Sequence, residues 1–222
     1  MTAPRLLVFD VNETLSDLGP IASRFADVGA PGLLAKAWFA SLLRDGFALT
    51  AVGENPAFAD LAQDAARALL GGEPLDRELD EAVTHVMEGF TALEVHPDVA
   101  QGIPELHALG IRMVTLSNGS ASVAQRLLRN AGLSDHFDRL LSVEDAGAWK
   151  PTAAAYQHAL TTCGVAAEDA MLVAVHPWDV DGAARAGLRT AWVDRAGTPY
   201  PRLFREPELR VASLVELAER LR

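Results

Sequence analysis

The stretch that decides the fold is Leu6-Leu7-Val8-Phe9-Asp10-Val11-Asn12-Glu13-Thr14-Leu15, in which four apolar residues lead directly into an aspartate. A short apolar run this close to the N-terminus is typical of a buried, central strand of a parallel sheet. Ligands of open α/β sheets bind outside the carboxyl ends of the strands, which is where Asp10 is expected to lie. An aspartate after a strand is equally well explained as a turn or helix-cap residue, so other segments must decide its role.

Further apolar, β-rich runs alternate with helical patterns along the second half of the chain. This alternation is typical of βαβ units that build a parallel sheet. The expected helices end at Gly132, Gly164 and Gly187, and a last helix begins at Ser213, with Glu216 at capping-box spacing. The expected strands are 5–9, 111–116, 139–143, 170–175 and 189–193, and the expected helices are 120–131, 152–163, 179–186 and 213–221.

Residues 16–95 break the alternation, because apolar residues recur there at three- and four-residue spacing. The sequence therefore predicts an α/β fold in which a Rossmann-like parallel-sheet core, 1–15 and 96–222, carries an inserted helical cap, 16–95. Since the insert leaves the core just after Asp10, it can overhang the strand ends and close a pocket. Its expected helices are 21–28, 32–44, 56–70 and 75–93, and the apolar stripe expected to face the other helices is Leu33, Ala37, Ala40, Leu43 and Phe47.

The composition narrows the classes of function. The chain of 222 residues carries a net charge of -11 and has no basic run that resembles a footprint for a phosphate backbone, so nucleic acid is not an expected partner. The single cysteine, Cys163, cannot form an internal disulfide, and no apolar stretch has the length of a signal sequence or a membrane span. We expect a soluble, cytoplasmic protein without a membrane partner.

Four separated segments are expected at the same edge of the sheet. They are Asp10, the triplet Ser117-Asn118-Gly119, Lys150 and Asp179, each at or after the carboxyl end of a predicted strand. Each has an ordinary structural explanation as a cap, turn or surface residue. The order of carboxylate, hydroxyl, lysine and carboxylate at successive strand ends is much less easily explained by chance, and indicates a catalytic site.

The segments VFDVNETL, TLSNGS, AWKP and HPWDVDGAARAG, followed by TAWVDR, resemble the haloacid dehalogenase superfamily over nearly the whole chain. Within it, the chain looks most like the type II 2-haloacid dehalogenases. The resemblance implies a nucleophilic Asp10 with Thr14 and Ser117 as its hydrogen-bonding neighbours, and Lys150 as a fixed cation. It implies no cofactor, and a small halogenated carboxylate as substrate. The residues that it implies on the substrate side, or at further pocket positions, are Asn118, Tyr156, Asp179 and Phe58.

The chemistry of these residue types agrees with the resemblance. Displacement at carbon needs an ionised aspartate, and a nearby lysine favours the ionised form. Attack by Asp10 would form an ester, which water would then open. Backbone amides at a helix N-terminus, here around Gly119, suit a carboxylate or a departing anion.

Phosphoryl transfer with Mg²⁺ is the main alternative, because most of the superfamily performs it. Its phosphatases typically carry two further aspartates, at positions that hold Asn12 and Val175 here. Asn12 cannot transfer a proton and Val175 cannot bind a metal, so no metal ligand is assigned. Glu144 and Asp145 keep metal binding open, and a catalytically silent binding protein is the third reading.

The chain also departs from the dehalogenase pattern. Asn12 and Glu13 replace the usual aromatic residue and glycine, and the cap arginine of the family has no counterpart between residues 29 and 39, where Lys36 is the only cation. His176 replaces an amide, and both a base that activates water and a structural hydrogen bond are open for it. A homodimer is left open, and the sequence does not assign an oligomeric state. The predicted catalytic residues are Asp10, Thr14, Ser117, Lys150, Asp179 and His176, and the predicted substrate-side residues are Asn12, Asn118, Gly119, Tyr156, Phe58 and Lys36.

Overall fold

The computed structural model describes residues 3–222, and contacts between residues divide the chain into two compact units. The core unit consists of the segment up to Ser16 together with Glu94–Arg222, and the helical unit is Asp17–Leu93.

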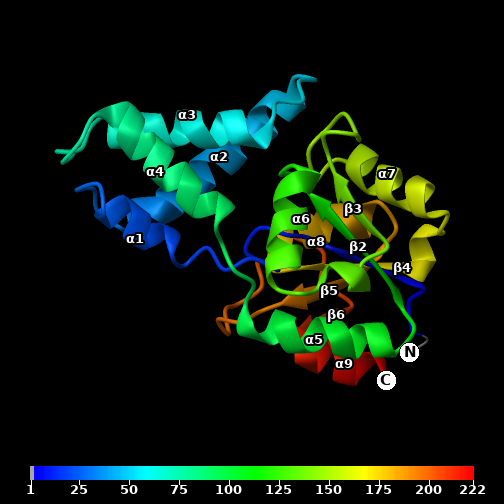
Figure 1. The fold of residues 1–222 in the computed structure, drawn as a ribbon. Coiled ribbons are helices and arrows are strands. Elements are labelled where there is room, and N and C mark those ends of the chain that lie inside the picture. The colour runs from blue at the N-terminus through cyan, green and yellow to red at the C-terminus, as the bar shows by residue number, and fades with distance from the viewer. Residues whose placement is uncertain (1–2) are drawn as a thin grey trace. The chain divides into compact units, whose positions relative to one another are not determined.

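A six-stranded, entirely parallel sheet forms the centre of the core unit (Figure 1). The strand order is β3-β2-β1-β4-β5-β6. The predicted α/β class and all five predicted strands are confirmed, whereas the sequence analysis missed the short edge strand β6. The strands are β1 Leu6–Phe9, β2 Arg112–Ser117, β3 Arg139–Ser142, β4 Ala170–Ala174, β5 Arg189–Val193 and β6 Leu209–Val211.

Strand β1 occupies a central position, and all four of its side chains are fully buried. Its last residue, Phe9, pairs with Thr115 of β2 on one side and Val173 of β4 on the other. Asp10 therefore leaves the sheet between the carboxyl ends of two neighbouring strands, and its backbone N–H still donates to the carbonyl of Val173, 3.1 Å away. This register places the residues after β1, β2 and β4 close to one another.

Helices cover both faces of the sheet. Residues of α5, α6 and α9 join one side of the strands in a single hydrophobic cluster, while α7 and α8 pack on the strands outside that cluster. Helices α5 and α9 run side by side (Figure 1). The core helices are α5 Pro97–Ala108, α6 Ala121–Asn130, α7 Ala153–Cys163, α8 Pro177–Arg185 and α9 Leu214–Leu221, with single 3-10 turns at Ser134–His136 and Ala167–Asp169.

Local signals explain where several of these helices begin and end. Ser213 caps α9, because its hydroxyl accepts the backbone N–H of Glu216 at 3.1 Å. The Glu216 carboxylate returns to the backbone N–H of Ala212, so the predicted capping box closes one residue earlier than expected. Gly164 ends α7 in the left-handed conformation that glycine adopts without strain (φ 64°).

The helical unit is built around Trp38. Its indole ring contacts Phe25, Phe39 and Phe90, and its Nε1–H donates to the carbonyl of Ala62 at 2.8 Å. The stripe predicted to face the other helices is wrong: Leu33 is 75% exposed, and the buried residues of α2 are Trp38, Phe39, Leu42 and Gly46. The helices are α1 Ile21–Ala26, α2 Leu34–Ala51, α3 Phe58–Leu70 and α4 Leu79–Thr91. Within residues 3–222, none of the helices combines the length and the apolar character needed to cross a membrane.

Close packing between α5 and α9 depends on Gly102. A Cβ added there would lie 2.6 Å from the Leu214 Cβ and 2.7 Å from the Leu214 carbonyl carbon. We expect Gly102→Ala to lower the free energy of unfolding by about 1–3 kcal/mol, because backbone atoms cannot move aside as a flexible side chain can. Urea denaturation measures this loss, with Gly72→Ala as control, since a Cβ at Gly72 meets nothing within 4 Å. Equal stability of both variants would contradict the packing argument.

Candidate active site

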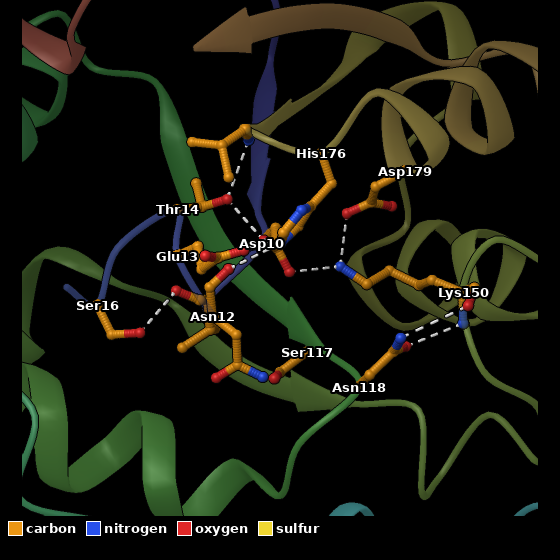
Figure 2. Close-up of polar contacts among 12 residues, drawn as sticks. Asp10, Asn12, Glu13, Thr14, Ser16, Ser117, Asn118, Lys150, His176 and Asp179 are labelled. Atoms are coloured by element: carbon orange, nitrogen blue, oxygen red, sulfur yellow. Dashed lines mark hydrogen bonds and ion pairs between the residues drawn. The ribbon is translucent and has the colours of Figure 1, made fainter. Parts of the chain in front are cut away.

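Asp10 lies at the centre of a buried polar cluster at the carboxyl ends of β1, β2 and β4 (Figure 2). Both of its carboxylate oxygens are held. Lys150 Nζ donates to Oδ1 at 2.8 Å, and Thr14 Oγ1 donates to Oδ2 at 2.6 Å. With 4% of its surface exposed, Asp10 is an oriented carboxylate with little solvent around it.

Lys150 links two carboxylates. Its side chain is fully buried, and Nζ lies 2.8 Å from Asp10 Oδ1 and 2.6 Å from Asp179 Oδ2. Asn118 positions its backbone, because Asn118 Oδ1 accepts the Lys150 N–H at 3.0 Å and Nδ2 donates to the Lys150 carbonyl at 3.5 Å. The predicted fixed cation is therefore in contact with the predicted nucleophile. Asn118 holds the lysine segment, and its predicted contact with substrate stays a prediction.

Asp179 stands in the first turn of α8 and completes the chain of contacts. Its second oxygen, Oδ1, accepts the Tyr156 hydroxyl at 2.6 Å. The same hydroxyl lies 3.0 Å from the Asp179 carbonyl. Tyr156 is fully buried on α7, so it serves to hold Asp179 in place.

The pKa values of the two carboxylates are shifted in opposite directions: that of Asp10 is lowered and that of Asp179 is raised. Burial acts to raise the pKa of Asp10, but the Lys150 charge, His176 and the hydrogen bonds from Lys150 and Thr14 outweigh it and hold that pKa below its usual value. Burial, together with the charge of Asp10, keeps the pKa of Asp179 above its usual value despite Lys150. Burial acts to lower the pKa of Lys150, yet the two carboxylates raise it. At neutral pH Asp10 is thus ionised beside a permanent cation.

Thr14 connects Asp10 to the neighbouring strand. While its hydroxyl donates to Asp10, it accepts the backbone N–H of Val175 at 3.1 Å. The turn that presents Thr14 contains Glu13 in the left-handed conformation (φ 61°), which a non-glycine residue adopts at a cost. Val175, which stands where a phosphatase would carry a metal-binding carboxylate, contributes its backbone to the site.

Three residues that the sequence analysis did not identify hold this turn. His96 Nε2 lies 2.9 Å from the Glu13 carbonyl, and Arg195 donates to the carbonyls of Glu13 and Thr14 at 3.4 and 3.0 Å. Asp98 accepts two hydrogen bonds from the Arg195 guanidinium, at 2.9 and 3.0 Å. Arg195 lay in a segment that carried the family resemblance, which was the available signal for it.

Ser117 closes the turn that follows β2. Its hydroxyl accepts the backbone N–H of Gly119 at 2.9 Å and so closes the turn after β2. Gly119 in turn accepts the Ser142 hydroxyl at 2.9 Å through its carbonyl. The hydroxyl proton of Ser117 is still available for donation, and Ser117 lies in the same cluster as Asp10 (Figure 2), so its role as a hydrogen-bonding neighbour of Asp10 stays a prediction.

His176 approaches Asp10 from the N-terminus of α8. Its Nε2 lies 3.1 Å from the Asn12 carbonyl and 3.7 Å from both Asp10 Oδ2 and Glu13 Oε2. A carbonyl oxygen only accepts hydrogen bonds, so the nitrogen that faces Asp10 carries the proton. A base that removes a proton from water would need a free lone pair on this nitrogen, and the observed contact opposes that predicted role.

Lys36 and Phe58 belong to the helical unit. Lys36 is exposed on α2, whereas Phe58 is buried and stacks on Phe90 with ring centres 5.5 Å apart. Phe58 therefore has a packing role in the structure. A contact between either residue and substrate stays a prediction.

The donor set of the cluster is poorly suited to a metal ion. In the described part of the chain, no three His, Cys, Asp or Glu side chains are grouped so that they could hold one. Both central carboxylates already bind the Lys150 ammonium. Glu144 and Asp145, considered above as metal ligands, are exposed in the loop after β3.

Comparisons with known proteins identify similar sequences and folds. The family of haloacid dehalogenase-like hydrolases matches residues 4–187. The chain is 27% identical to an (S)-2-haloacid dehalogenase from Pseudomonas sp. (strain YL), over 96% of this chain and 92% of that protein. It is 32% identical to haloacetate dehalogenase H-2 from Moraxella sp. (strain B) over 56% of this chain, a match that spans 55% of that relative. A crystal structure of a dehalogenase with an intermediate complex superimposes with a TM-score of 0.93 at 28% identity, covering 100% of this chain and 98% of that one.

Removing the Lys150 charge should destabilise the core unit. We expect Lys150→Met to lower the free energy of unfolding at neutral pH by about 3–5 kcal/mol, because two buried carboxylates lose their shared cation. In wild type, the lowered pKa of Asp10 contributes stability at neutral pH that is lost as the pH falls through its folded-state pKa. Without Lys150 this contribution disappears, so the difference in the free energy of unfolding between wild type and Lys150→Met should become smaller at acidic pH.

Chemical denaturation of both proteins from neutral to acidic pH measures this gap. Lys36→Met removes an exposed lysine and serves as the matched control, with an expected change within about 0.5 kcal/mol. A gap for Lys150→Met that stayed constant with pH would show that lost packing, and not charge, destabilises the variant.

Proposed function

The chain belongs to the haloacid dehalogenase-like hydrolases, and from this premise we propose that it is a metal-independent (S)-2-haloacid dehalogenase acting through an ester on Asp10. The observation that carries the proposal is the buried Asp10 carboxylate, which Lys150 holds at one oxygen and Thr14 at the other. The similarity to (S)-2-haloacid dehalogenases supports the choice of substrate class.

The first step is a displacement at carbon. A carboxylate oxygen of Asp10 attacks C2 of a small 2-halocarboxylate, the carbon–halogen bond breaks, and the halide leaves with the electron pair. Substitution by a carboxylate needs the ionised form, which the lowered pKa of Asp10 supplies. Thr14 and Lys150 restrict the rotation of the carboxylate, and orientation of this kind lowers the barrier.

The second step opens the ester. Water adds to the carboxyl carbon of Asp10, negative charge develops on the carbonyl oxygen, and cleavage of the ester releases a 2-hydroxy acid. The Lys150 ammonium lies against Oδ1, where it would stabilise that charge. Asp179 and Tyr156 keep the ammonium in position, so they act through Lys150.

On the substrate side, Asn12, Ser117 and Asn118 lie beside Asp10 (Figure 2). Asn12 is 7% exposed, and its side-chain amide is a donor that suits a carboxylate. We assign the chemistry to the core unit, because the hydrogen bonds that orient Asp10 all come from that unit.

Phosphoryl transfer is the competing function, and the donor set opposes it. A Mg²⁺ site needs an oxygen shell built partly from carboxylates, and Asn12 and Val175 supply none at the two positions that matter. Asp10 and Asp179 already share Lys150. The chelator experiment below decides between the two reactions.

Replacing the nucleophile should remove turnover without unfolding the protein. We expect Asp10→Asn to lower kcat by at least three orders of magnitude, since a neutral amide is a much weaker nucleophile. Single turnover of wild type in ¹⁸O water should place the label in Asp10 before it appears in product, as read by mass spectrometry of the peptide that contains residue 10. Label entering product directly would show that water attacks the substrate.

Activity screens separate the three functions. Halide release from short 2-halo acids should persist in excess chelator, whereas a phosphatase would release phosphate from small esters only with Mg²⁺. A tenfold rise of halide release on addition of Mg²⁺ would contradict the metal-free proposal. Absence of both activities would favour a binding protein.

A further inference from the structure

His176 and Glu13 form an acid–imidazole pair beside the nucleophile. His176 Nε2 is 3.7 Å from Glu13 Oε2 and 3.7 Å from Asp10 Oδ2, so the ring nitrogen lies between an outer and an inner carboxylate. The His176 side chain is 10% exposed and the Glu13 side chain 43%. The pair therefore stands at the solvent side of Asp10 Oδ2, whereas Lys150 holds the buried side at Oδ1.

The nitrogen that faces Asp10 is a proton donor. The three oxygens around it belong to the Asn12 carbonyl and the two carboxylates, and all of them accept. The carboxylates of Asp10 and Glu13 each lie 3.7 Å from this nitrogen. Asp179, the other nearby charge, is bound to Lys150.

The ring is also fixed in orientation. It stacks on Trp178 with ring centres 5.0 Å apart and an interplanar angle of 19°. His176 is the residue immediately before Pro177, the first residue of α8, so its backbone is held at the start of the helix. The Nε2–H donor contacts the Asn12 carbonyl at 3.1 Å and lies 3.7 Å from Asp10 Oδ2, so a small rotation of the ring would turn it toward that oxygen.

We propose that His176 is the general acid that protonates the departing alkoxide when the Asp10 ester is hydrolysed, with Oδ2 as the ester oxygen. The inference rests on the proposed function and names a role in its second step. Oδ1 then remains the carbonyl oxygen against Lys150, and Oδ2 becomes the oxygen of the released 2-hydroxy acid.

Water adds to the carboxyl carbon and loses one proton to solvent; the bond from that carbon to Oδ2 breaks, and the imidazolium proton passes to the alkoxide. This leaves a 2-hydroxy acid, a neutral His176 and a protonated Asp10. Because the pKa of Asp10 is held low, its new proton passes to His176, which restores the starting state.

Glu13 is a positioning residue in this scheme, since it acts through His176. The turn keeps Glu13 in the left-handed conformation, and the contacts of its carbonyl with His96 and Arg195 fix the backbone there. Its carboxylate lies 3.7 Å from His176 Nε2 and limits the rotation of the imidazole ring.

The test follows ester decay in single-turnover experiments by intact-protein mass spectrometry. We expect His176→Gln to slow ester decay by about 10²–10⁴-fold, the usual contribution of a general acid, while ester formation changes little. The ester should therefore accumulate. Equal slowing of both steps, or no accumulation, would overturn the proposal.

The acidity of the leaving group distinguishes an acid from a base. The ester formed from 2-chloropropionate releases lactate, and the ester formed from 2,3-dichloropropionate releases 3-chlorolactate. The 2-hydroxyl of 3-chlorolactate is the more acidic of the two. A better leaving group needs less protonation, so His176→Gln should slow ester decay by a smaller factor for the dichloro substrate. A base acting on water predicts the same defect for both, and that result would overturn the acid role.

Glu13→Gln supplies the matched charge test. We expect ester decay to slow about two- to fivefold, the effect of an exposed ion pair, with rescue by Glu13→Asp. Asp27→Asn removes the carboxylate 3.1 Å from His85 in the helical unit and should leave ester decay unchanged. Equal effects of Glu13→Gln and Asp27→Asn would overturn the role of Glu13.

Two outcomes separate this inference from the proposed function. If wild type forms no ester, the proposed function fails. If the ester forms and decays at the normal rate in His176→Gln, only this inference fails.

Discussion

The structure of the site depends on one buried cation shared by two carboxylates. Lys150 contacts Asp10 and Asp179 at 2.8 and 2.6 Å, and all three groups are withdrawn from water. Burying three charges is favourable only when each has partners of suitable geometry, which Thr14 and Tyr156 provide. This requirement explains why residues from four strand ends converge, and it keeps Asp10 ionised in a nearly dry environment.

The polar shell around this cation is equally determined by the fold. Asn118 holds the Lys150 backbone from the turn after β2, and Thr14 joins the β1 turn to the backbone at the end of β4. Side chains that the family resemblance placed against substrate thus serve in part to position the catalytic groups. The chemistry of the proposed enzyme and the stability of its core unit rest on the same hydrogen bonds.

The strands and the central site residues could be predicted from sequence because their signals are local. Short apolar runs that end in Asp10, Ser117 and Val175 define where the parallel strands end, and a motif identified Lys150. Two kinds of feature were not predicted: which face of a helix is buried, and which residues far apart in sequence are in contact. The buried face of α2 was assigned wrongly because Leu33 and Trp38 both fit a helical period. The contacts of Arg195 were missed because Asp98 lies 97 positions away in the sequence and Thr14 lies 181 positions away.

The tether at Arg195 also determines where the chain can bend. The two segments that connect the core and helical units are fixed to each other inside the core unit, through the bridge of Ser16 with Val95 and the hydrogen bond from the His96 N–H to the Leu15 carbonyl. Arg195 adds a connection from Asp98 to the Thr14 carbonyl. The connecting segments are therefore anchored within the core unit up to Ser16 and from Val95 onward, so the orientation of the Asp10 carboxylate is set by the core unit itself.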